Sequence, residues 1–465
     1  MLGGRVKTLH PKVHGGLLFR RNLPEDQKQA SEHGIAPIDL VVVNLYPFES
    51  TAAKKDLTAE ELIENIDIGG PTMLRSAAKN FESVTVITDP ADYNRVAQEL
   101  ESSRETSLVT RLDLARKVFA TTSRYDGMIA TELERLSVSA NQIALSEKPV
   151  LPQRLHFALR RQQELRYGEN PHQAAALYIG SGRALRGLAA ANQLQGKELS
   201  YNNFVDLEAA RSLAAEFQRP AAVIIKHNNP CGTAEQETLR DAYLRALACD
   251  PISAFGGVLA FNRPVDAATA EEVAKLFAEC IAAPAFDEKA KSMFAAKKNL
   301  RLLELPPGGL EADRELQLKR ISGGMLVQQP DLGEIAESEL RTVTKRAPSP
   351  EEMQNMRFAW KVCKHVKSNA IVFARDGATL GVGAGQMSRV DSVRLAVMKA
   401  QSPLQGAVVA SDAFFPFPDG VEEAAKAGAT AVIQPGGSVR DNDVVAAADR
   451  LGLAMVFTGM RHFLH

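Results

Sequence analysis

Short apolar runs alternate with amphipathic stretches along almost the whole chain. The runs hold four to six mostly β-branched or small residues, and they predict strands at 40–43, 84–88, 221–226, 257–261, 370–374, 407–410, 429–434 and 453–458. Continuous apolar runs separated by helical segments are typical of parallel or mixed sheets with helices on both faces. The pattern therefore predicts an α/β protein.

Two polar, proline-bearing stretches interrupt this pattern, one near 140–155 and one near 330–352. Such stretches are typical of connections between domains, so we predict three units at 1–145, 155–330 and 350–465. The last two units share a faint repeat. Helix-like DAYLRALAC precedes DPISAFGGVLAF in one, and DSVRLAVMK precedes AQSPLQGAVVASDAFF in the other, which is consistent with a duplicated helix–turn–strand unit.

Composition narrows the class of protein. The 465 residues are 45% hydrophobic and 24% charged, as in globular proteins. Lys and Arg number 55 against 56 Asp and Glu, which argues against a nucleic-acid-binding protein. Because no apolar run reaches about 18 residues, we expect no membrane span. Four scattered cysteines without a C-x-x-C pair argue against a zinc cage or a disulfide framework and favour a reducing cytoplasm.

A basic cluster near the start of the chain suits an anion. Arg5 and Lys7 follow Gly3 and Gly4, and an extended backbone would place both cations on one face. Two cations beside glycine backbone favour a phosphate or a carboxylate. A solvated basic segment is the alternative.

The sequence IDIGGPT precedes a helical stretch. Proline is favoured at the first helical position, so we predict that Pro71 starts a helix with Gly70 as its cap. The glycines would let an anion approach the free N–H groups of the helix start. Lys79 lies about two turns further on, and it reaches the same ligand only if that ligand lies along the helix. An ordinary helix start with a surface lysine is the alternative.

Two further clusters follow predicted strands, where ligands collect in open α/β sheets. Asn44 and Tyr46 follow the run DLVVV, although simple packing also explains an aromatic there. Phe414, Phe415 and Phe417 lie beside prolines after GAVVAS and would form an apolar wall for a flat heterocycle. Burial in a subunit interface is the alternative for this wall. The run GVGAGQ lacks the GxGxxG spacing of a nicotinamide-cofactor site.

The strongest cluster is KHNNPCG, at the end of the predicted strand 221–226. The charge of Lys226 disfavours the protonated form of His227, which keeps the imidazole available as a base. Lys226 would then stabilise negative charge that develops on an acyl oxygen. A turn with a structural histidine is the alternative.

In this order, the motifs resemble the bifunctional enzyme family of late purine biosynthesis that combines AICAR transformylase with IMP cyclohydrolase. The resemblance covers essentially the whole chain and rests on GGRVKTLHPKVHGG, NLYPF, IDIGG, RYGENPHQ, KHNNPCG, DPISAFGG, KSNAIV, GVGAGQMSR, SDAFFPF and MRHFLH. It implies a doubly wound N-terminal cyclohydrolase domain that is similar to methylglyoxal synthase. Two cytidine-deaminase-like α/β/α units would follow it.

The resemblance also implies two reactions and their residues. The C-terminal part would transfer a formyl group from 10-formyltetrahydrofolate to AICAR, giving FAICAR, and the N-terminal part would cyclise FAICAR to IMP with loss of water. The implied transformylase residues are Lys226 and His227 as catalytic groups, with Arg166, Tyr167, Gly256, Glu279, Asn369, Arg389, Phe414, Arg461 and His465 binding substrate. The implied cyclohydrolase residues are Lys79, Asp67 and Tyr46 as catalytic groups, with Arg5, Lys7, Thr8, Asn44, Ile68 and Gly69 binding the nucleotide.

The same resemblance implies a cytoplasmic homodimer whose transformylase sites combine both subunits, and a monovalent cation such as potassium. We expect no zinc, no nucleic acid and no membrane among its partners. Family members begin upstream of MLGGRVKTLHP, so we expect the first domain to lack a strand–helix portion. We therefore expect the transformylase to survive and the cyclohydrolase to be impaired or absent.

Two other function classes stay open. A zinc nucleoside deaminase would share the fold, but it needs H-x-E and P-C-x-x-C, and Cys231 is followed by Gly232, Thr233 and Ala234. A non-catalytic nucleotide-binding or scaffold protein would keep the fold without transferring a formyl group.

Overall fold

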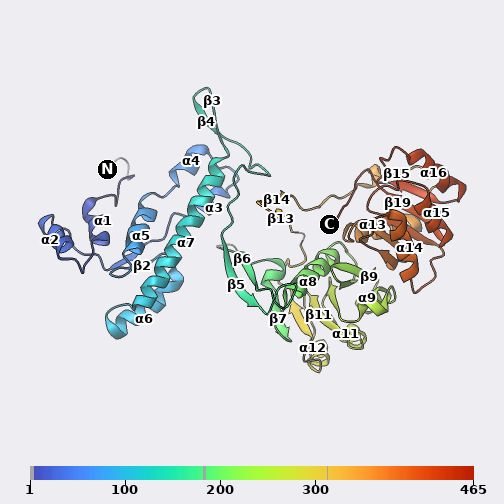
Figure 1. The fold of residues 1–465 in the computed structure, drawn as a ribbon, viewed down its shortest axis with the longest axis horizontal. Helices are drawn as coiled ribbons and strands as arrows, with labels where there is room; N and C mark the ends of the chain where they lie inside the picture. The colour runs from blue at the N-terminus through green and yellow to red at the C-terminus, as the bar shows by residue number, and fades with distance from the viewer. Residues whose placement is uncertain (1–4, 182–184, 312) are drawn as a thin grey trace. The chain divides into compact units, whose positions relative to one another are not determined.

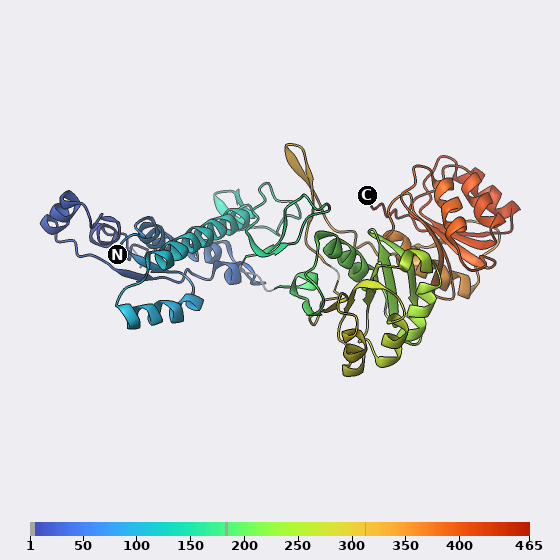
Figure 2. The same cartoon turned by 60° about the horizontal axis from the view of Figure 1, so that its bottom comes forward.

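The computed structural model describes residues 5–181, 185–311 and 313–465. The chain divides into two compact units, Met1–Arg160 with Gly180–Gly182 and Arg161–Ile179 with Arg183–His465. Figures 1 and 2 trace the chain through both units. The connection expected near 330–352 lies inside the second unit.

The first unit is built on two parallel strands, β1 (Leu40–Val42) and β2 (Thr85–Ile87), so the strands predicted at 40–43 and 84–88 are confirmed. Its helices are α1 (Pro11–Leu18), α2 (Pro24–Glu32), α3 (Phe48–Ala52), α4 (Ala59–Glu64), α5 (Gly69–Lys79), α6 (Tyr93–Ser103) and α7 (Leu108–Leu133). A core that includes the fully buried Leu17, Leu74 and Val86 joins α1, α5 and the strands. A hairpin of β3 (Leu136–Ser139) and β4 (Gln142–Leu145) follows α7.

The second unit contains a single 12-stranded mixed sheet in the order β15-β20-β19-β18-β16-β17-β9-β8-β10-β11-β12-β7. The strands are β7 (Asn192–Gln195), β8 (Ala221–Lys226), β9 (Asn229–Glu235), β10 (Gly257–Phe261), β11 (Ala278–Ala283), β12 (Arg301–Glu304), β15 (Arg341–Thr342), β16 (Ile371–Arg375), β17 (Ala378–Gly383), β18 (Ala407–Ser411), β19 (Ala429–Gln434) and β20 (Ala454–Phe457). All six strands predicted in this region are present, three of them with the predicted bounds. The α/β class is confirmed.

The sheet consists of two halves with the same topology. Reading outward from the β9–β17 pair, each half has an antiparallel hairpin, then a central strand antiparallel to it, then two parallel strands and an antiparallel edge strand. The halves join edge to edge where β17 runs antiparallel to β9. The faint sequence repeat therefore reflects a repeated architecture.

Helices cover both faces of this sheet. Alternate strand residues enter different cores, because successive side chains on a strand point to opposite faces. One core packs against α8 (Tyr201–Ala214) and α13 (Pro350–Lys364). The opposite face packs against α9 (Leu239–Leu247), α11 (Ala267–Val273) and α12 (Glu288–Ala295) in one half, and against α14 (Arg389–Lys399), α15 (Asp419–Lys426) and α16 (Asp441–Arg450) in the other.

Besides the β3–β4 hairpin, two small hairpins of the described chain lie outside the large sheet. One pairs β5 (Leu159–Leu165) with β6 (Ala175–Gly180), and the other pairs β13 (Gln317–Ile321) with β14 (Gly324–Gln328). Within the described ranges, none of the helices combines the length and the apolar character that crossing a membrane requires.

Candidate functional site

The hairpin between β8 and β9 presents the predicted pair Lys226 and His227. Strand β8 is buried along its apolar residues and ends at Lys226, which pairs with Asn229 across the hairpin. The two residues of the loop, His227 and Asn228, have φ of 51° and 64°. This is the left-handed geometry of a two-residue hairpin turn, and a histidine adopts it less readily than Gly or Asn. The fold thus holds an exposed imidazole in an uncommon conformation at a strand end.

Lys226 lies against Gly256, another predicted site residue. Its ammonium donates hydrogen bonds to the carbonyl oxygens of Phe255 at 3.0 Å and Gly256 at 2.9 Å. Gly256 has φ of 67°, and a Cβ added to it would lie 3.1 Å from Lys226 Nζ. Position 256 therefore requires glycine both for its backbone and for the space that Lys226 occupies.

A cavity of about 230 Å³ opens where the two halves of the sheet meet. Lys226 and His227 line it from one half and Lys399 lines it from the other. Lys399 Nζ lies 3.3 Å from Asp250 Oδ2 and 3.2 Å from Ser253 Oγ. Lysine side chains from both halves thus line one cavity, an arrangement that favours an anion or a developing oxyanion.

Two further groups lining this cavity have altered acidity. Burial by itself raises the pKa of Asp250, but hydrogen bonds from Ser253 and the nearby Lys399 hold it below its usual range. Burial raises the pKa of the Cys231 thiol to about 12, so this thiol stays protonated at neutral pH. The chemistry available at the cavity is therefore that of amines, imidazole and carboxylate rather than of a thiolate.

On the other side of the turn lie two acidic residues. Asp206, on α8, accepts a hydrogen bond from the Asn228 N–H at 2.7 Å. Glu279, a predicted site residue on β11, accepts one from Asn203 Nδ2 at 3.0 Å. Burial raises the pKa of Asp206, with Glu279 adding to the effect and Lys226 and His227 opposing it. Sequence reasoning missed Asp206, because its partner is a backbone group that only the fold brings near.

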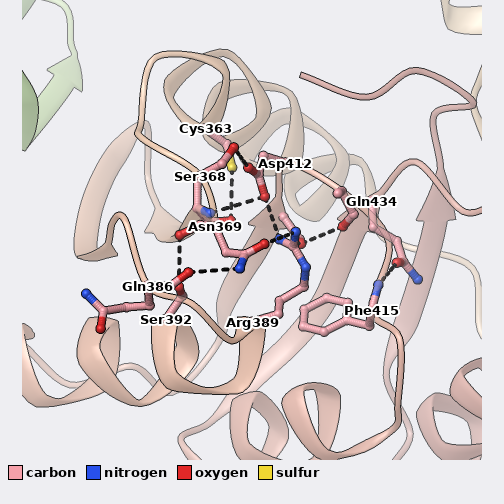
Figure 3. Close-up of polar contacts among 12 residues, drawn as sticks. Cys363, Ser368, Asn369, Gln386, Arg389, Ser392, Asp412, Phe415 and Gln434 are labelled. Atoms are coloured by element: carbon pink, nitrogen blue, oxygen red, sulfur yellow. Dashed lines mark hydrogen bonds and ion pairs between the residues drawn. The ribbon is translucent and has the colours of Figure 1, made fainter. Parts of the chain in front are cut away.

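Asn369 and Arg389 belong to a buried polar network, drawn in Figure 3. Arg389 is 7% exposed, donates to Asn369 Oδ1 at 2.7 Å and forms an ion pair with the fully buried Asp412. The Asp412 carboxylate also accepts hydrogen bonds from the Ala370 N–H and from the Ser368 hydroxyl. The structure thus brings two predicted residues together and holds them on a carboxylate whose role the sequence did not reveal.

The end of the chain closes on the same network. The His462 N–H donates to the Asp412 carbonyl at 3.1 Å, and the Ser368 N–H donates to the Leu464 carbonyl at 2.9 Å. The predicted residues Arg461 and His465 are exposed, and the Arg461 guanidinium lies 4.3 Å from the centre of the Phe463 ring.

Two aromatic predictions have different outcomes. Arg166 stacks on Tyr167, 4.6 Å from its ring centre, and donates to its hydroxyl at 2.9 Å. The expected wall of three phenylalanines is wrong, because Phe415 is buried in a core of the second half. Phe414 is 37% exposed and is available to a ligand, whereas Phe417 packs under Arg440.

In the first unit, four predicted residues gather at the start of α5. Asp67 accepts hydrogen bonds from the Gly70 N–H at 2.9 Å and from the Tyr46 N–H at 3.4 Å. The Thr8 hydroxyl is buried and finds no hydrogen-bond partner among the described residues, and a Cβ on Gly69 would lie 2.7 Å from it. An unpartnered hydroxyl beside a helix start suits an anionic ligand.

One more residue at this site was not foreseen. The Tyr125 hydroxyl on α7 accepts a hydrogen bond from the Asp67 N–H at 2.7 Å. Burial raises the pKa of this phenol, so it stays neutral and fixes the backbone of Asp67. No pattern around Tyr125 in the sequence distinguishes it from a core aromatic residue.

The other predicted residues of this unit do not join that group. Lys79 ends the eleven-residue α5 and lines a separate cavity of about 500 Å³ with Arg75 and Arg116. Arg5 forms an ion pair with Glu64. The side chains of Lys7 and Ile68 are exposed. Asn44 Nδ2 lies 3.2 Å from the Tyr93 hydroxyl.

Two local expectations for this unit are wrong. The helix begins at Gly69 rather than at Pro71. The Asp67 carboxylate accepts the Gly70 N–H at its start. A proline is tolerated in the first turn, because the N–H that it lacks would have no partner within the helix. Residues 5–8 form a turn and bends rather than an extended segment. Gly3, Gly4 and the expectation that depends on Met1 lie outside the described residues.

The described parts of the chain contain no group of three or more His, Cys, Asp or Glu side chains that could hold a metal ion. The expectation of no zinc stays a prediction that metal analysis can test.

Comparisons with known proteins agree with the resemblance. A family described as "AICARFT/IMPCHase bienzyme" matches residues 77–399, and an MGS-like domain matches residues 1–72. The "Bifunctional purine biosynthesis protein PurH" of Magnetococcus marinus is 56% identical over 479 aligned residues, covering 100% of this chain and 89% of that protein. A solved structure titled "Crystal structure of ForH" is 40% identical and covers 28% of this chain and 68% of its own, with a TM-score of 0.24.

The family match spans the half of the large sheet that carries Lys226 and His227, together with β15, β16 and β17 of the other half. The relative extends the similarity to the full chain, including the group around Asp67. The chain therefore belongs to the AICARFT/IMPCHase bienzyme family.

Proposed function

We propose that formyl transfer takes place at the Lys226–His227 turn and ring closure at the start of α5. The chain is a bifunctional enzyme of purine biosynthesis with AICAR formyltransferase and IMP cyclohydrolase activities. The observation that carries the assignment of the first site is an exposed imidazole, held at a strand end beside an ammonium that faces the same cavity.

In the first reaction, the 5-amino group of AICAR attacks the formyl carbon of 10-formyltetrahydrofolate. His227 takes a proton from the amine as the new C–N bond forms, and Lys226 stabilises the negative charge on the formyl oxygen. The bond from the formyl carbon to the folate nitrogen then breaks, and a proton passes to that nitrogen. FAICAR and tetrahydrofolate are released.

The remaining predicted residues would hold the nucleotide and the folate. The proposed set is Arg166, Tyr167, Gly256, Glu279, Asn369, Arg389, Phe414, Arg461 and His465. Phe414 and the stacked Arg166 offer flat surfaces to a heterocycle. The Arg389 guanidinium already pairs with Asp412. Its role is therefore to hold Asn369 in place as well as to contact substrate.

In the second reaction, the carboxamide nitrogen of FAICAR attacks the formyl carbon and water leaves. Asp67 and Tyr46 would move the protons, while Thr8, Asn44, Ile68, Gly69, Arg5 and Lys7 would bind the nucleotide. Lys79 would contribute only through a ligand that runs along α5, which is about 16 Å long. The unpartnered Thr8 hydroxyl beside Gly69 supports a ligand at the helix start.

A homodimer is part of the proposal, and the β13–β14 hairpin supports it. Leu318, Ile321, Met325 and Leu326 are 43%, 44%, 47% and 56% exposed on this hairpin. An isolated two-stranded hairpin is marginally stable in water, and exposed apolar side chains of this size mark interaction surfaces. A second copy of the chain is the occupant we propose.

We also propose a monovalent cation near Asp412 and a cytoplasmic location. The Asp412 carboxylate, the Ser368 hydroxyl and the Leu464 carbonyl lie together, and oxygen groups are the ligands that hard cations accept. The four cysteines are free thiols, which supports a reducing compartment.

The test is to incubate the chain with AICAR and 10-formyltetrahydrofolate and to identify products by mass spectrometry, with a control that lacks AICAR. We expect FAICAR and then IMP, in place of the impaired cyclohydrolase expected from the sequence alone, because the similarity to the relative covers the whole of this chain. Absence of any formylated nucleotide would contradict the first assignment, and FAICAR that accumulates without IMP would contradict the second.

A further inference from the structure

The repeated architecture supplies an internal comparison for the catalytic turn. In the second half, the loop between β16 and β17 is also a two-residue turn, formed by Asp376 and Gly377 with φ of 54° and 64°. It occupies the place that His227 and Asn228 occupy between β8 and β9, with φ of 51° and 64°. The two turns therefore have the same backbone geometry.

Each turn is held by a helix on the same face of the sheet. The Gly377 N–H donates to Asn355 Oδ1 of α13 at 3.0 Å, and the Asn228 N–H donates to Asp206 Oδ1 of α8 at 2.7 Å. A neutral amide is therefore sufficient to hold the turn of the second half, which contains no histidine. In the first half a carboxylate makes the equivalent bond, although a buried charge costs more than a buried amide.

The charged groups around Asp206 indicate why this position carries a carboxylate rather than an amide. Lys226 and His227 on the turn favour its ionised form, Glu279 on β11 opposes it, and burial raises its pKa. The Asp206 carboxylate is thus held at the turn that carries the ammonium and the imidazole, and it interacts electrostatically with both. When His227 takes up the amine proton, the resulting imidazolium has Lys226 as a neighbour of like charge, and a carboxylate nearby offsets that repulsion.

We propose that Asp206 is a positioning residue for formyl transfer, which holds the His227–Asn228 turn and places a compensating negative charge beside the imidazole. The proposal rests on formyl transfer at this turn. Asp206 itself makes no contact with substrate in this role. The second half has an equivalent hydrogen bond, from the Gly377 N–H to Asn355, whereas the negative charge occurs only in the half that carries His227.

The test is Asp206→Asn, which copies the residue of the second half. We expect this variant to fold with the wild-type melting temperature, because Asn355 makes the same bond. We expect the acid limb of the kcat profile for formyl transfer to move to lower pH by roughly 0.5–1 unit and the plateau to fall by about three- to tenfold. An NMR titration of the His227 ring should move in the same direction.

Asn355→Ala is the matched control, since it removes the equivalent bond and leaves every charge near His227 in place. It should lower the melting temperature without moving the acid limb. A wild-type pH profile in Asp206→Asn would overturn the proposal, and so would loss of folding in that variant, because the neutral amide would then be insufficient. Absence of formyl transfer in the wild-type chain would instead contradict the proposed function.

Discussion

At the scale of single residues, the candidate site depends on backbone conformations that few residue types adopt. His227 and Asn228 lie in the left-handed region, and Gly256 supports Lys226 from the same region. For a non-glycine residue this conformation costs about 1–2 kcal/mol. Hydrogen bonds to Asp206 and from Asn229 Nδ2 to the His227 carbonyl offset that cost. Strain of this kind persists where surrounding structure enforces it, typically at functional sites.

Gly256→Ala tests this arrangement. The added Cβ would lie 3.1 Å from Lys226 Nζ at φ of 67°, so we expect a loss of about 1–2 kcal/mol in unfolding free energy and at least about a tenfold fall in formyl transfer as Lys226 moves. Gly406→Ala is the matched control, with φ of 77° and only Arg375 Cδ at 4.0 Å. Equal losses of transfer in both variants would contradict the role given to Lys226.

A second residue-scale prediction concerns pH. Burial by itself raises the pKa of Glu216, but hydrogen bonds from His365 and Lys364 outweigh burial and lower it to about 2. The carboxylate thus stabilises the fold by roughly 3 kcal/mol at pH values above its ordinary pKa of 4.5. This stability is lost as pH falls toward 2.

The measurement is urea unfolding, followed by the fluorescence of the single tryptophan, Trp360. Wild type should exceed Glu216→Gln in unfolding free energy at pH 7, and the difference should shrink steadily between pH 4.5 and pH 2. A difference that is independent of pH would contradict the account.

At the scale of elements, glycines set how closely helices approach the sheet. A Cβ on Gly232 of β9 would lie 1.9 Å from the Ala246 carbonyl oxygen of α9, and one on Gly381 of β17 would lie 2.3 Å from that of Ala396 on α14. The two halves thus use the same close packing on the strands that join them. Gly381 itself lines the cavity beside Lys226.

Gly232→Ala should therefore destabilise the second unit by more than about 3 kcal/mol, since a backbone oxygen cannot move aside without shifting α9. Gly324→Ala, on β14 of the same unit, serves as the control, because an added Cβ there would lie 3.9 Å from Ile321 Cγ1, an ordinary van der Waals distance. Thermal unfolding of both variants decides the matter. A Gly232→Ala protein as stable as the control would show that α9 is not fixed at this distance.

Much at this scale could be predicted from sequence. Continuous apolar runs gave the bounds of β8, β10 and β19 without error, because buried strands carry their own signal. The start of α5 could not be predicted, since the Asp67 carboxylate rather than Pro71 determines it. The left-handed conformation of His227 and the hydrogen bond to Asp206 could not be predicted from the sequence either. Their causes lie in residues distant along the chain, and only folding brings these residues together.

At the scale of the whole molecule, duplication explains the position of the transformylase site. Two halves of like topology meet at β9 and β17, and the cavity takes Lys226 and His227 from one half and Lys399 from the other. Only the first half carries the histidine. The second half keeps the turn with Asp376 and Gly377 and supplies the opposite wall.

The proposed dimer is also tested at this scale. Light scattering coupled to size exclusion should give twice the chain mass for wild type. Leu326→Glu on the β13–β14 hairpin should weaken the dimer, because a carboxylate would have to be buried in the interface. Val439→Glu, at a position that is fully exposed, should leave the dimer intact. A monomeric wild type would contradict the proposal.

The most direct test of the formyl-transfer assignment is the turnover of AICAR by His227→Asn. Asparagine tolerates the left-handed turn, so the variant keeps the fold and loses only the base. We expect kcat for FAICAR formation to fall by about 10²- to 10⁴-fold, while the melting temperature and AICAR binding remain those of the wild type. One proton-transfer group contributes at least about a hundredfold to the rate. Turnover within about twofold of the wild-type value would therefore contradict the role of His227 as the base.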